Sequence, residues 1–501
     1  MLKRLTSHMQ FFAKNESHQT LYKTIEWSYS LLKLDERNIL NQLVIFRSSC
    51  TLEAIETICT IPEYTDIFDV LKILIDKSLM RQVSGGNGET RFRLPYIIRE
   101  YIVGKLEKRE IEDVQQRHAI YYLEVVEKMA PALTGLEQKE ALALLEEEQE
   151  NIQTALAWCI EQGEFTAACR FVEAVWRFWW MHGCIQEGRK WLDVLLISAS
   201  EALVSPLLHS RCLVIASRLA SNQNDYEQAA RFAEQALTLS QLSGDQPALS
   251  AAYTTQAEVA FHKGDYEGAI LALEKSLAIQ RQLGNRRNTA SLLNNLGNVV
   301  LQQGDLVRSA ALQEESLRLF RAVKDQWAIA TALNSLGEVE RRRGNTKQAK
   351  ILYEEGLKLC RLLKYTEGVA LALVSLGDIA RSQENYTHAA ALYKESLALF
   401  SEIENRIGIT VCLQGLAEIA YSQEKLAFAT RLFAQAEVTA YALETAVLQY
   451  ERDTHNLTLD QLRSSLGQDS FEGFWTIGQM ATLEQIMLEV LDDEKKTTNA
   501  E

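Results

Sequence analysis

The feature that most constrains this chain is a repeat of 40 residues. An Asp-Tyr pair, or a polar relative of it, recurs at that spacing through six units, from Asp225-Tyr226 to Lys425-Leu426. Small residues keep the same register, and one such set is Ser217, Ala257, Gly297, Gly337, Gly377 and Ala417. A repeat of this length is one supersecondary unit that buries its apolar face only against a neighbour. The sequence therefore predicts a stacked array rather than a single globular core.

Each unit contains two amphipathic stretches, with apolar residues at the i, i+3, i+4 and i+7 spacing of a helix, as in 289–302 and 307–323. Between them, Gln303-Gly304-Asp305 offers a glycine for a left-handed helix end and an aspartate to cap the next helix. The chain has only 5 prolines in 501 residues. Only Pro247 lies between residues 210 and 440, which suits helices that must stay straight to stack.

The order of Leu-Gly, Gly-Asp-Tyr, Ala and Ala/Ser-Leu in each unit resembles the tetratricopeptide repeat. The period is 40 rather than the usual 34 or so, and the closing proline of that motif is absent. The resemblance implies a superhelix of helical hairpins, with the extra residues in the second helix and its following loop. It is similar to the long repeats in the sensor arms of bacterial signalling ATPases. Glu437, which replaces a recurring leucine, indicates a repeat close to a cap.

Residues 18–108 have a different pattern. Helical segments are expected near Ile25, after Asp35 and Thr51 as N-caps, and from Asp66. Two short strands, 79–83 and 90–94, flank a glycine-rich turn, and a helix follows from Pro95. Helices followed by a two-stranded hairpin predict a winged-helix domain.

Three strings resemble the winged-helix segment of the STAND (NB-ARC-type) regulatory ATPases: 18–21 with 25–29, 74–79, and 91–94 with 98–101. In that family the winged helix follows the nucleotide-binding module and precedes a helical-repeat arm. This sequence contains no G-x-x-x-x-G-K-[ST] loop, so we expect no phosphate cradle and no ATP hydrolysis. The resemblance implies a sensor arm that serves an ATPase core on another chain. The alternative is a truncated fragment of a STAND ATPase.

The fold class we predict is an all-α superhelix of tetratricopeptide-like hairpins with a small N-terminal winged-helix domain. Four aromatic residues, Trp176, Phe178, Trp179 and Trp180, are interpreted as core, with an aromatic ligand pocket as the alternative. His182 beside them is interpreted as a turn or cap residue. The expected organisation is a remnant extension (1–17), the winged helix (18–108), a helical linker with degenerate repeats (109–200), the repeat superhelix (201–445), capping helices (446–488) and a disordered polar tail (489–501).

The first helix of each unit is expected to line a concave groove that binds a protein or peptide partner, or a small-molecule inducer. Side-chain amides such as Asn294 and Asn334 can donate to and accept from an extended peptide backbone. The run Arg341-Arg342-Arg343 favours an acidic ligand. A solvated polar face is the alternative. The candidate groove residues are Thr254, Glu258, Asn294, Asn298, Gln302, Asn334, Glu338, Arg341, Arg342, Asp378, Arg381, Gln414 and Glu418.

The charge balance opposes nucleic-acid binding. With 52 Lys and Arg against 67 Asp and Glu, the net charge is -15, and duplex phosphates would repel the chain as a whole. DNA is therefore not an expected partner. A transcriptional regulator that contacts DNA through its winged helix stays as the alternative, because that domain carries Lys72, Lys77, Arg81, Arg91, Arg93 and Arg99.

No pattern predicts an enzyme. The 8 His are scattered without an H-E-x-x-H motif, G-x-S-x-G is absent, and the 8 Cys have no zinc-ligand spacing. The run Glu146-Glu147-Glu148 is interpreted as a solvated helix face. We therefore expect no catalytic residue, metal or cofactor. The sequence has no signal-peptide pattern and no apolar run of membrane-spanning length, and its unpaired Cys suit a reducing cytoplasm.

Overall fold

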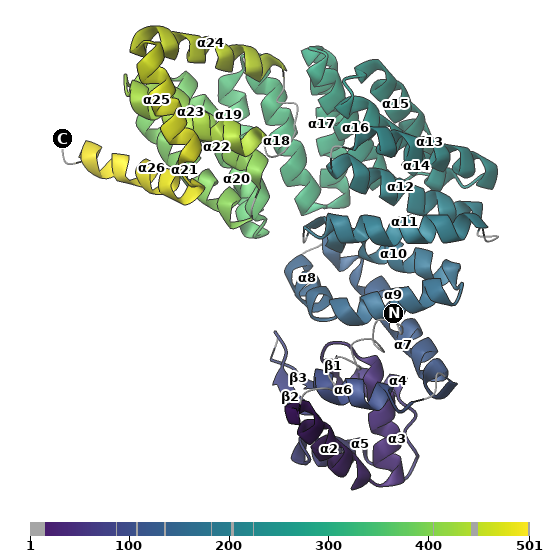
Figure 1. Ribbon diagram of the computed structural model, residues 1–501. Helices are drawn as coiled ribbons and strands as arrows, with labels where there is room; N and C mark the ends of the chain where they lie inside the picture. Colours follow the sequence, from purple (N-terminus) through teal and green to yellow (C-terminus); the bar gives the residue numbers. More distant parts are fainter. Residues whose placement is uncertain are drawn as a thin grey trace. The chain divides into compact units, whose positions relative to one another are not determined.

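The computed structural model describes residues 16–86, 88–106, 109–134, 137–181, 183–201, 205–223, 225–403, 405–441 and 449–498. This part of the chain is largely helical with one small sheet (Figure 1). It forms two compact units, residues 1–219 with 235–243 and residues 220–234 with 244–501. Most of the expected N-terminal extension, His182 and the last residues of the tail lie outside the described residues.

The first unit begins with the winged-helix domain. Its elements are α2 (Glu16–Ser30), α3 (Leu34–Gln42), η1 (Leu43–Ile45), β1 (Cys50–Thr51), α4 (Leu52–Ile58), α5 (Ile67–Asp76), β2 (Arg81–Ser84), β3 (Thr90–Arg93) and α6 (Tyr96–Val103). Thr51 caps α4 as predicted, because its hydroxyl accepts from the Ala54 N–H at 3.1 Å. The prediction of Asp35 as an N-cap is wrong. Lys33 holds that position, since its N–H donates to the Glu36 carboxylate at 2.9 Å from within the first turn.

The sheet of this domain has three strands, where the sequence predicted a hairpin of two. β1 pairs antiparallel with β3, and the order is β1-β3-β2. Cys50 lies opposite Phe92, and Thr51 lies opposite Arg91. A strand of two residues is too short to show the alternation by which strands are recognised in sequence.

The rest of the first unit is helical: α7 (Arg109–Met129), η2 (Ala132–Thr134), α8 (Gln138–Glu147), α9 (Gln149–Glu161), α10 (Phe165–Met181) and α11 (Ile185–Glu201). α12 (Pro206–Asn222) and α13 (Tyr226–Ser243) contribute residues to both units. α7 packs against α9 and α10, and α10 packs against α11. Phe171, Val172 and Leu195 are fully buried among these helices.

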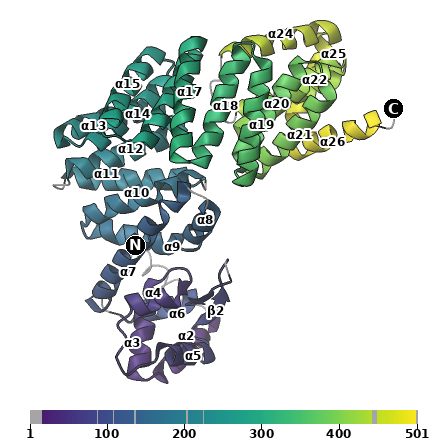
Figure 2. The ribbon, with the colours of Figure 1, turned by 180° about the vertical axis from the view of Figure 1, so that it is seen from behind.

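The second unit holds the regular hairpins (Figures 1 and 2). Each first helix packs against its own second helix, which in turn packs against the first helix of the next unit. The helices are α14 (Gln246–His262), α15 (Tyr266–Gln282), α16 (Arg286–Gln302), α17 (Leu306–Val323), α18 (Gln326–Arg342), α19 (Thr346–Leu362), α20 (Thr366–Ser382), α21 (Tyr386–Glu402), α22 (Arg406–Ser422) and α23 (Leu426–Tyr441).

The connections between these helices confirm the predicted cap chemistry. Asp305 accepts from the Arg308 N–H at 3.0 Å, and Asn285 accepts from the Asn288 N–H at 3.1 Å. Gly304 has a φ of 87°, in the left-handed region that favours glycine. Where a unit has no glycine, another residue takes the left-handed conformation at that position: Lys324, Lys364, Glu384 and Glu424.

The prediction that the second helix and its loop take the extra residues is wrong. α16 has 17 residues and α17 has 18. Three residues connect α16 to α17, and two connect α17 to α18. Both helices are therefore long and both connections are short, which preserves side-by-side packing along the full length of each helix.

The C-terminal helices α24 (Gln449–Leu466), α25 (Gln468–Met480) and α26 (Leu483–Thr498) cover the last hairpin. Their buried side chains Leu462, Phe471 and Ile486 join a cluster with Phe433 of α23. Glu437 is exposed, as expected for a repeat next to a cap. None of the described helices combines the length and the apolar character needed to span a bilayer.

Candidate functional site

The expected groove residues lie on the first helices of five successive units, α14, α16, α18, α20 and α22. Side chains 40 positions apart occupy equivalent places on these helices. Asn298, Glu338, Asp378 and Glu418 form one such set, and all four are half-buried. That these positions bind a ligand stays a prediction, but their hydrogen-bond and charge partners within the array are clear.

Glu338 is the centre of the interactions on α18. Its carboxylate accepts from Arg341 through two bonds of 2.8 Å and from Arg342 at 2.7 Å. Burial alone would raise the pKa of Glu338, but the hydrogen bonds and charges of the two arginines outweigh burial, so this pKa lies below its usual value. Arg343 pairs in the same way with Glu340 at 2.6 Å. All three arginines of this run are therefore paired, although the two carboxylates balance only two of the three positive charges.

A second group of charges connects α20 to α22. Arg381 of α20 forms an ion pair with Glu418 of α22 and lies 3.7 Å from Asp378. Burial raises the pKa of both carboxylates above their usual values, although Arg381 acts in the opposite direction. Glu338, Arg341, Arg342, Asp378, Arg381 and Glu418 are called the charged cluster below. It contains three acidic and three basic side chains.

The second helices also contribute to this face, which the sequence did not predict. The hydroxyls of Tyr353 and Tyr393 donate to Glu338 at 3.2 Å and to Asp378 at 2.5 Å. Gln313, at the equivalent position, donates to Asn298 Oδ1 at 2.8 Å. Each pair is 15 residues apart. The sequence signal was present in three units, because Gln313, Tyr353 and Tyr393 recur at 40-residue spacing, each 15 residues after its acceptor.

The recurring glycines of the first helices make room for these donors. A Cβ on Gly337 would lie 2.7 Å from the Tyr353 ring, and a Cβ on Gly297 would lie 2.7 Å from Gln313 Nε2. A glycine at this position therefore lets the polar side chain of the second helix lie flat on the backbone of the first.

The amide side chains of α16, α17 and α18 are not fully satisfied. Asn294 is 9% exposed, and its Oδ1 has no hydrogen-bond partner among the described residues. Gln313 Oε1 and Asn334 Oδ1 also have no hydrogen-bond partner among the described residues. Asn294, Gln313 and Asn334 are called the amide row below. Most buried acceptors in proteins are paired, so three unpaired oxygens in one region are unusual.

The other expected groove residues fall into two groups. Thr254 is already engaged, because its hydroxyl donates to the Ser250 carbonyl at 2.9 Å and lies 3.0 Å from Ser276 Oγ. Glu258, Gln302 and Gln414 are half-buried and lie outside the charged cluster. The structure therefore brings together the charged residues of α18 to α22, but Thr254 has a structural partner in its own hairpin.

The wing of the first unit is anchored by a buried polar network. Arg91 of β3 is 1% exposed and pairs with Glu148, and it also donates to the Ser49 carbonyl at 2.9 Å. Glu148 accepts from Tyr122 at 2.9 Å and from Asn151 at 2.8 Å. Burial lowers the pKa of Arg91, but Glu148 more than compensates, and the net shift is upward. The interpretation of the 146–148 run as a fully solvated face is wrong at Glu148, which is 5% exposed.

This network removes part of the basic surface expected of a DNA-binding winged helix. Arg91 and Arg99 are buried. The Gly86 N–H, in the turn between β2 and β3, donates to Glu147. The other four basic residues that the sequence offered for DNA contact in the winged-helix domain are not buried: Lys72, Lys77, Arg81 and Arg93.

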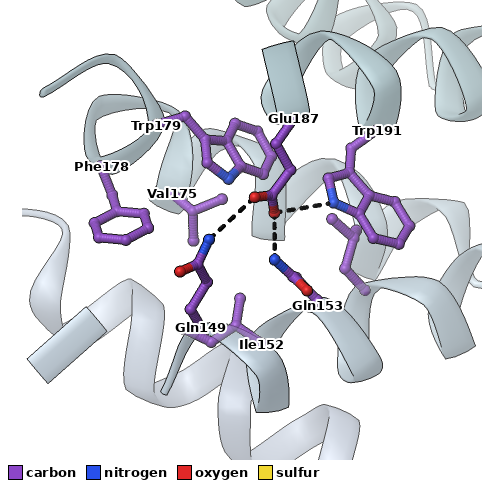
Figure 3. Close-up of a pocket in the computed structure, with 9 residues that line it drawn as sticks. Gln149, Ile152, Gln153, Val175, Phe178, Trp179, Glu187 and Trp191 are labelled. Atoms are coloured by element: carbon purple, nitrogen blue, oxygen red, sulfur yellow. Dashed lines mark hydrogen bonds between the residues drawn. The ribbon is translucent and has the colours of Figure 1, made fainter. Parts of the chain in front are cut away.

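A small pocket is lined by residues of α9, α10 and α11, among them the aromatic residues Phe178 and Trp179 of α10 (Figure 3). Phe178 and Trp179 are buried on its wall, and Glu187 accepts from Gln149 at 3.0 Å and Gln153 at 2.6 Å. Trp191 donates to the same carboxylate at 3.4 Å. A Cβ on Gly188 would lie 2.7 Å from the Trp179 ring. This close packing supports the interpretation of Phe178 and Trp179 as core residues, whereas Trp180 is 47% exposed.

Among the described residues, no three His, Cys, Asp or Glu side chains are grouped so that they could hold a metal ion. The cysteines are free thiols, and apart from Cys184, which is half-buried, they are buried. Burial raises the pKa of Cys59 and of Cys412 to about 12, which suppresses their reactive thiolate form.

Two family models match parts of the chain. The model described as a tetratricopeptide repeat matches residues 288–362, and the model described as a winged helix-turn-helix domain matches residues 32–107. Relatives from Mycobacterium tuberculosis and Mycobacterium bovis, each named "Putative HTH-type transcriptional regulator", are 28% identical over 247 residues. The match covers 48% of this chain and only 28% of each relative.

Two solved structures are similar to this chain at low identity. The STAND protein with a tetratricopeptide repeat sensor from Pyrococcus horikoshii is 15% identical, with a TM-score of 0.46, over 87% of this chain and 66% of that chain. A Rap protein complexed with Competence and Sporulation Factor is 15% identical, with a TM-score of 0.46, over 70% of this chain and 99% of that chain. Similarity at this level carries no information on ligand or activity.

Proposed function

We propose that this chain, which carries tetratricopeptide repeats and a winged helix-turn-helix domain, is a non-catalytic sensor or scaffold arm of a regulatory system. The repeat face formed by the first helices would bind an extended segment of a partner protein or peptide. The observation that carries this proposal is the amide row, in which Asn294, Gln313 and Asn334 each have an unpartnered buried oxygen.

An extended peptide supplies the donors that these oxygens lack. Its backbone N–H groups recur along the chain, and an amide side chain can accept from one while donating to a neighbouring carbonyl. Packed helices lie about 8–10 Å apart, which is about three residues of extended chain at ~3.3 Å each. Asn294 of α16 and Asn334 of α18 could therefore contact the same peptide at separate points.

The charged cluster would set the charge preference of the ligand. Arg341 and Arg342 were expected to attract an acidic ligand, but both already bind Glu338. A ligand carboxylate would have to displace Glu338 from the two arginines, and the displaced carboxylate would need a donor from the ligand. A ligand that carries both signs of charge fits this arrangement better than a purely acidic one.

The test is selection of a random peptide library on the full chain, followed by binding measurements with the enriched peptides. The double variant Asn294→Ala/Asn334→Ala should weaken binding at least about tenfold, because each lost hydrogen bond is worth about 1 kcal/mol. Asn456→Ala removes an exposed amide on α24 and is the matched control. Unchanged binding in the double variant would remove the amide row from the proposal.

Charge reversal of Arg341 and Arg342 tests the charged cluster separately. If the same peptides bind this variant as they bind the original chain, the arginines have no part in recognition. If no peptide is enriched at all, a small-molecule inducer becomes the better ligand class.

The mechanism we propose is that ligand binding in the repeat face biases how the winged helix docks on an ATPase core carried by another chain. The boundaries that we assign are 18–108 for the winged helix, 109–200 for the linker, 201–445 for the repeats and 446–488 for the cap. The proposed location is the cytoplasm.

A DNA-contacting regulator is the second candidate, since the mycobacterial relatives are named as HTH-type regulators. The buried state of Arg91 and Arg99 argues against it, because neither guanidinium is free to contact a phosphate backbone. An electrophoretic shift with random duplex at low salt decides between the two. Tight binding that falls steeply with salt would favour the DNA-contacting function.

A further inference from the structure

Three arginines of the first unit have no carboxylate partner. Within the described residues, Arg47, Arg93 and Arg99 form no ion pair, whereas Arg91 beside them is paired with both Glu147 and Glu148. Arg99 is 6% exposed, and its Nε has no hydrogen-bond partner. Its Nη2 makes a long contact of 3.4 Å with the Leu94 carbonyl. A buried guanidinium without a counter-charge is costly, which makes this the most unusual charge of the winged helix.

The backbone places the three side chains in one region. The Arg47 N–H donates to Asn151 Oδ1 at 2.8 Å, which holds Arg47 against the first turn of α9. Arg93 shares a face of β3 with Arg91, because residues two apart on a strand point the same way, and Arg91 on that face contacts Glu148. The guanidinium of Arg99 lies at Leu94, the residue that follows Arg93.

The electrostatics support this convergence. Burial, and after it the like charges of Arg47 and Arg93, lower the pKa of Arg99 to about 10. Glu150, an exposed residue of α9, acts in the opposite direction but forms no ion pair with Arg99. Cys50 also faces Arg99, and burial raises its pKa well above the usual value, so the thiol supplies no negative charge. The positive end of α9 adds to the unbalanced charge.

We propose that Arg47, Arg93 and Arg99 form a binding site for a compact oxyanion, either free phosphate or the phosphate group of a small molecule. Guanidinium groups recognise such oxygens through paired N–H donors. Arg93 is exposed and Arg47 is half-buried, so they form the accessible side of the site, with Arg99 beneath them. A DNA backbone fits less well, because Arg99 is buried and the neighbouring Glu146, Glu147 and Glu150 would repel a long polyanion.

The experiment is calorimetric titration of the full chain with orthophosphate and with pyrophosphate, in chloride buffer of matched ionic strength. We expect saturable binding that the double variant Arg47→Gln/Arg93→Gln weakens at least about tenfold, since both accessible charge-assisted donors are lost. Arg286→Gln, an exposed arginine of α16, removes the same kind of charge and should bind normally.

Arg99→Lys tests the buried position while keeping its charge. It should also weaken phosphate binding, because an ammonium cannot replace the planar pair of donors. If this variant does not fold, the double variant at Arg47 and Arg93 still decides the matter. Absence of phosphate-dependent heat above the chloride control, or equal binding in the double variant, would overturn the proposal. Tighter binding of a short DNA duplex, lost in the same variants, would also overturn it.

Discussion

Substitution of Gly337 by alanine tests the packing of the repeat face directly. Gly337 lies within α18, and a Cβ placed there would be 2.7 Å from Tyr353 Cε1, 2.9 Å from Cδ1 and 3.1 Å from Cζ. The ring cannot easily move away, because Tyr353 is 1% exposed and its hydroxyl is bonded to Glu338. The clash therefore has to be absorbed by the backbone or by loss of the tyrosine hydrogen bond.

Two opposing effects set the change in stability that Gly337→Ala causes. Alanine is favoured over glycine in a helix interior by about 1 kcal/mol. Overpacking of a buried site costs about 1–3 kcal/mol. Because the ring is both buried and hydrogen-bonded, we expect the upper part of that range, and a net destabilisation of about 1–2 kcal/mol. The destabilisation should be smaller for Gly377→Ala, because a Cβ on Gly377 would lie 3.2 Å from the Tyr393 ring.

Gly473 in α25 provides the control, because a Cβ there meets nothing within 4 Å. Gly473→Ala should therefore stabilise its helix by about 1 kcal/mol. A repeat array does not unfold as one two-state unit. The assay is therefore native-state hydrogen exchange of amides in α18, α19 and α25, which reports local stability. If Gly337→Ala protects α18 as Gly473→Ala protects α25, the argument from ring packing is refuted.

Three further predictions concern single side chains. Tyr353→Phe removes the hydroxyl bond to Glu338 without a cavity and should cost about 0.5–1.5 kcal/mol by local hydrogen exchange; no change would mean that the bond is not formed in solution. Glu148→Gln leaves the buried charge of Arg91 poorly paired and should cost about 3 kcal/mol, seen as faster proteolysis between β2 and β3. His118 is buried, and its burial and the charge of Arg47 lower its pKa to about 3. The folded state therefore keeps the His118 imidazole neutral, whereas the same imidazole in the unfolded chain takes up a proton near pH 6.5. The contribution of neutral His118 to the free energy of unfolding should be fully present above pH 6.5 and should fall by up to about 1.4 kcal/mol per pH unit between pH 6.5 and 3. In denaturant titrations, His118→Phe should flatten this dependence of the unfolding free energy on pH.

Sequence reasoning located the repeat and its caps because their signals are local. Asp305 and the Arg308 N–H that it caps are three residues apart, and the φ of Gly304 depends on its own backbone. The same reasoning failed at Asp35, because the competing cap at Lys33 depends on where Glu36 points. It also failed at β1, whose two residues form a strand only because β3 pairs with them.

The candidate site was predictable in register but not in chemistry. The 40-residue spacing correctly placed Asn294 on one first helix, α16, and Asn334 and Glu338 on the next, α18. It could not show that Glu338 already pairs with both Arg341 and Arg342, because a charge run in sequence does not reveal which carboxylate lies within hydrogen-bond distance. Nor could it show that a tyrosine 15 residues away reaches the same carboxylate.

The sequence by itself determined the helical hairpin, its 40-residue repeat and its stacking, since an amphipathic period and a cap act within a few residues of each other. Only the tertiary structure decided which charges are buried and which are paired. Arg91 and Glu148 are 57 residues apart, and neither residue alone predicts a buried ion pair. The buried Arg99 depends in the same way on distant segments, because removal from water is a property of everything packed around a side chain and not of its neighbours in the chain.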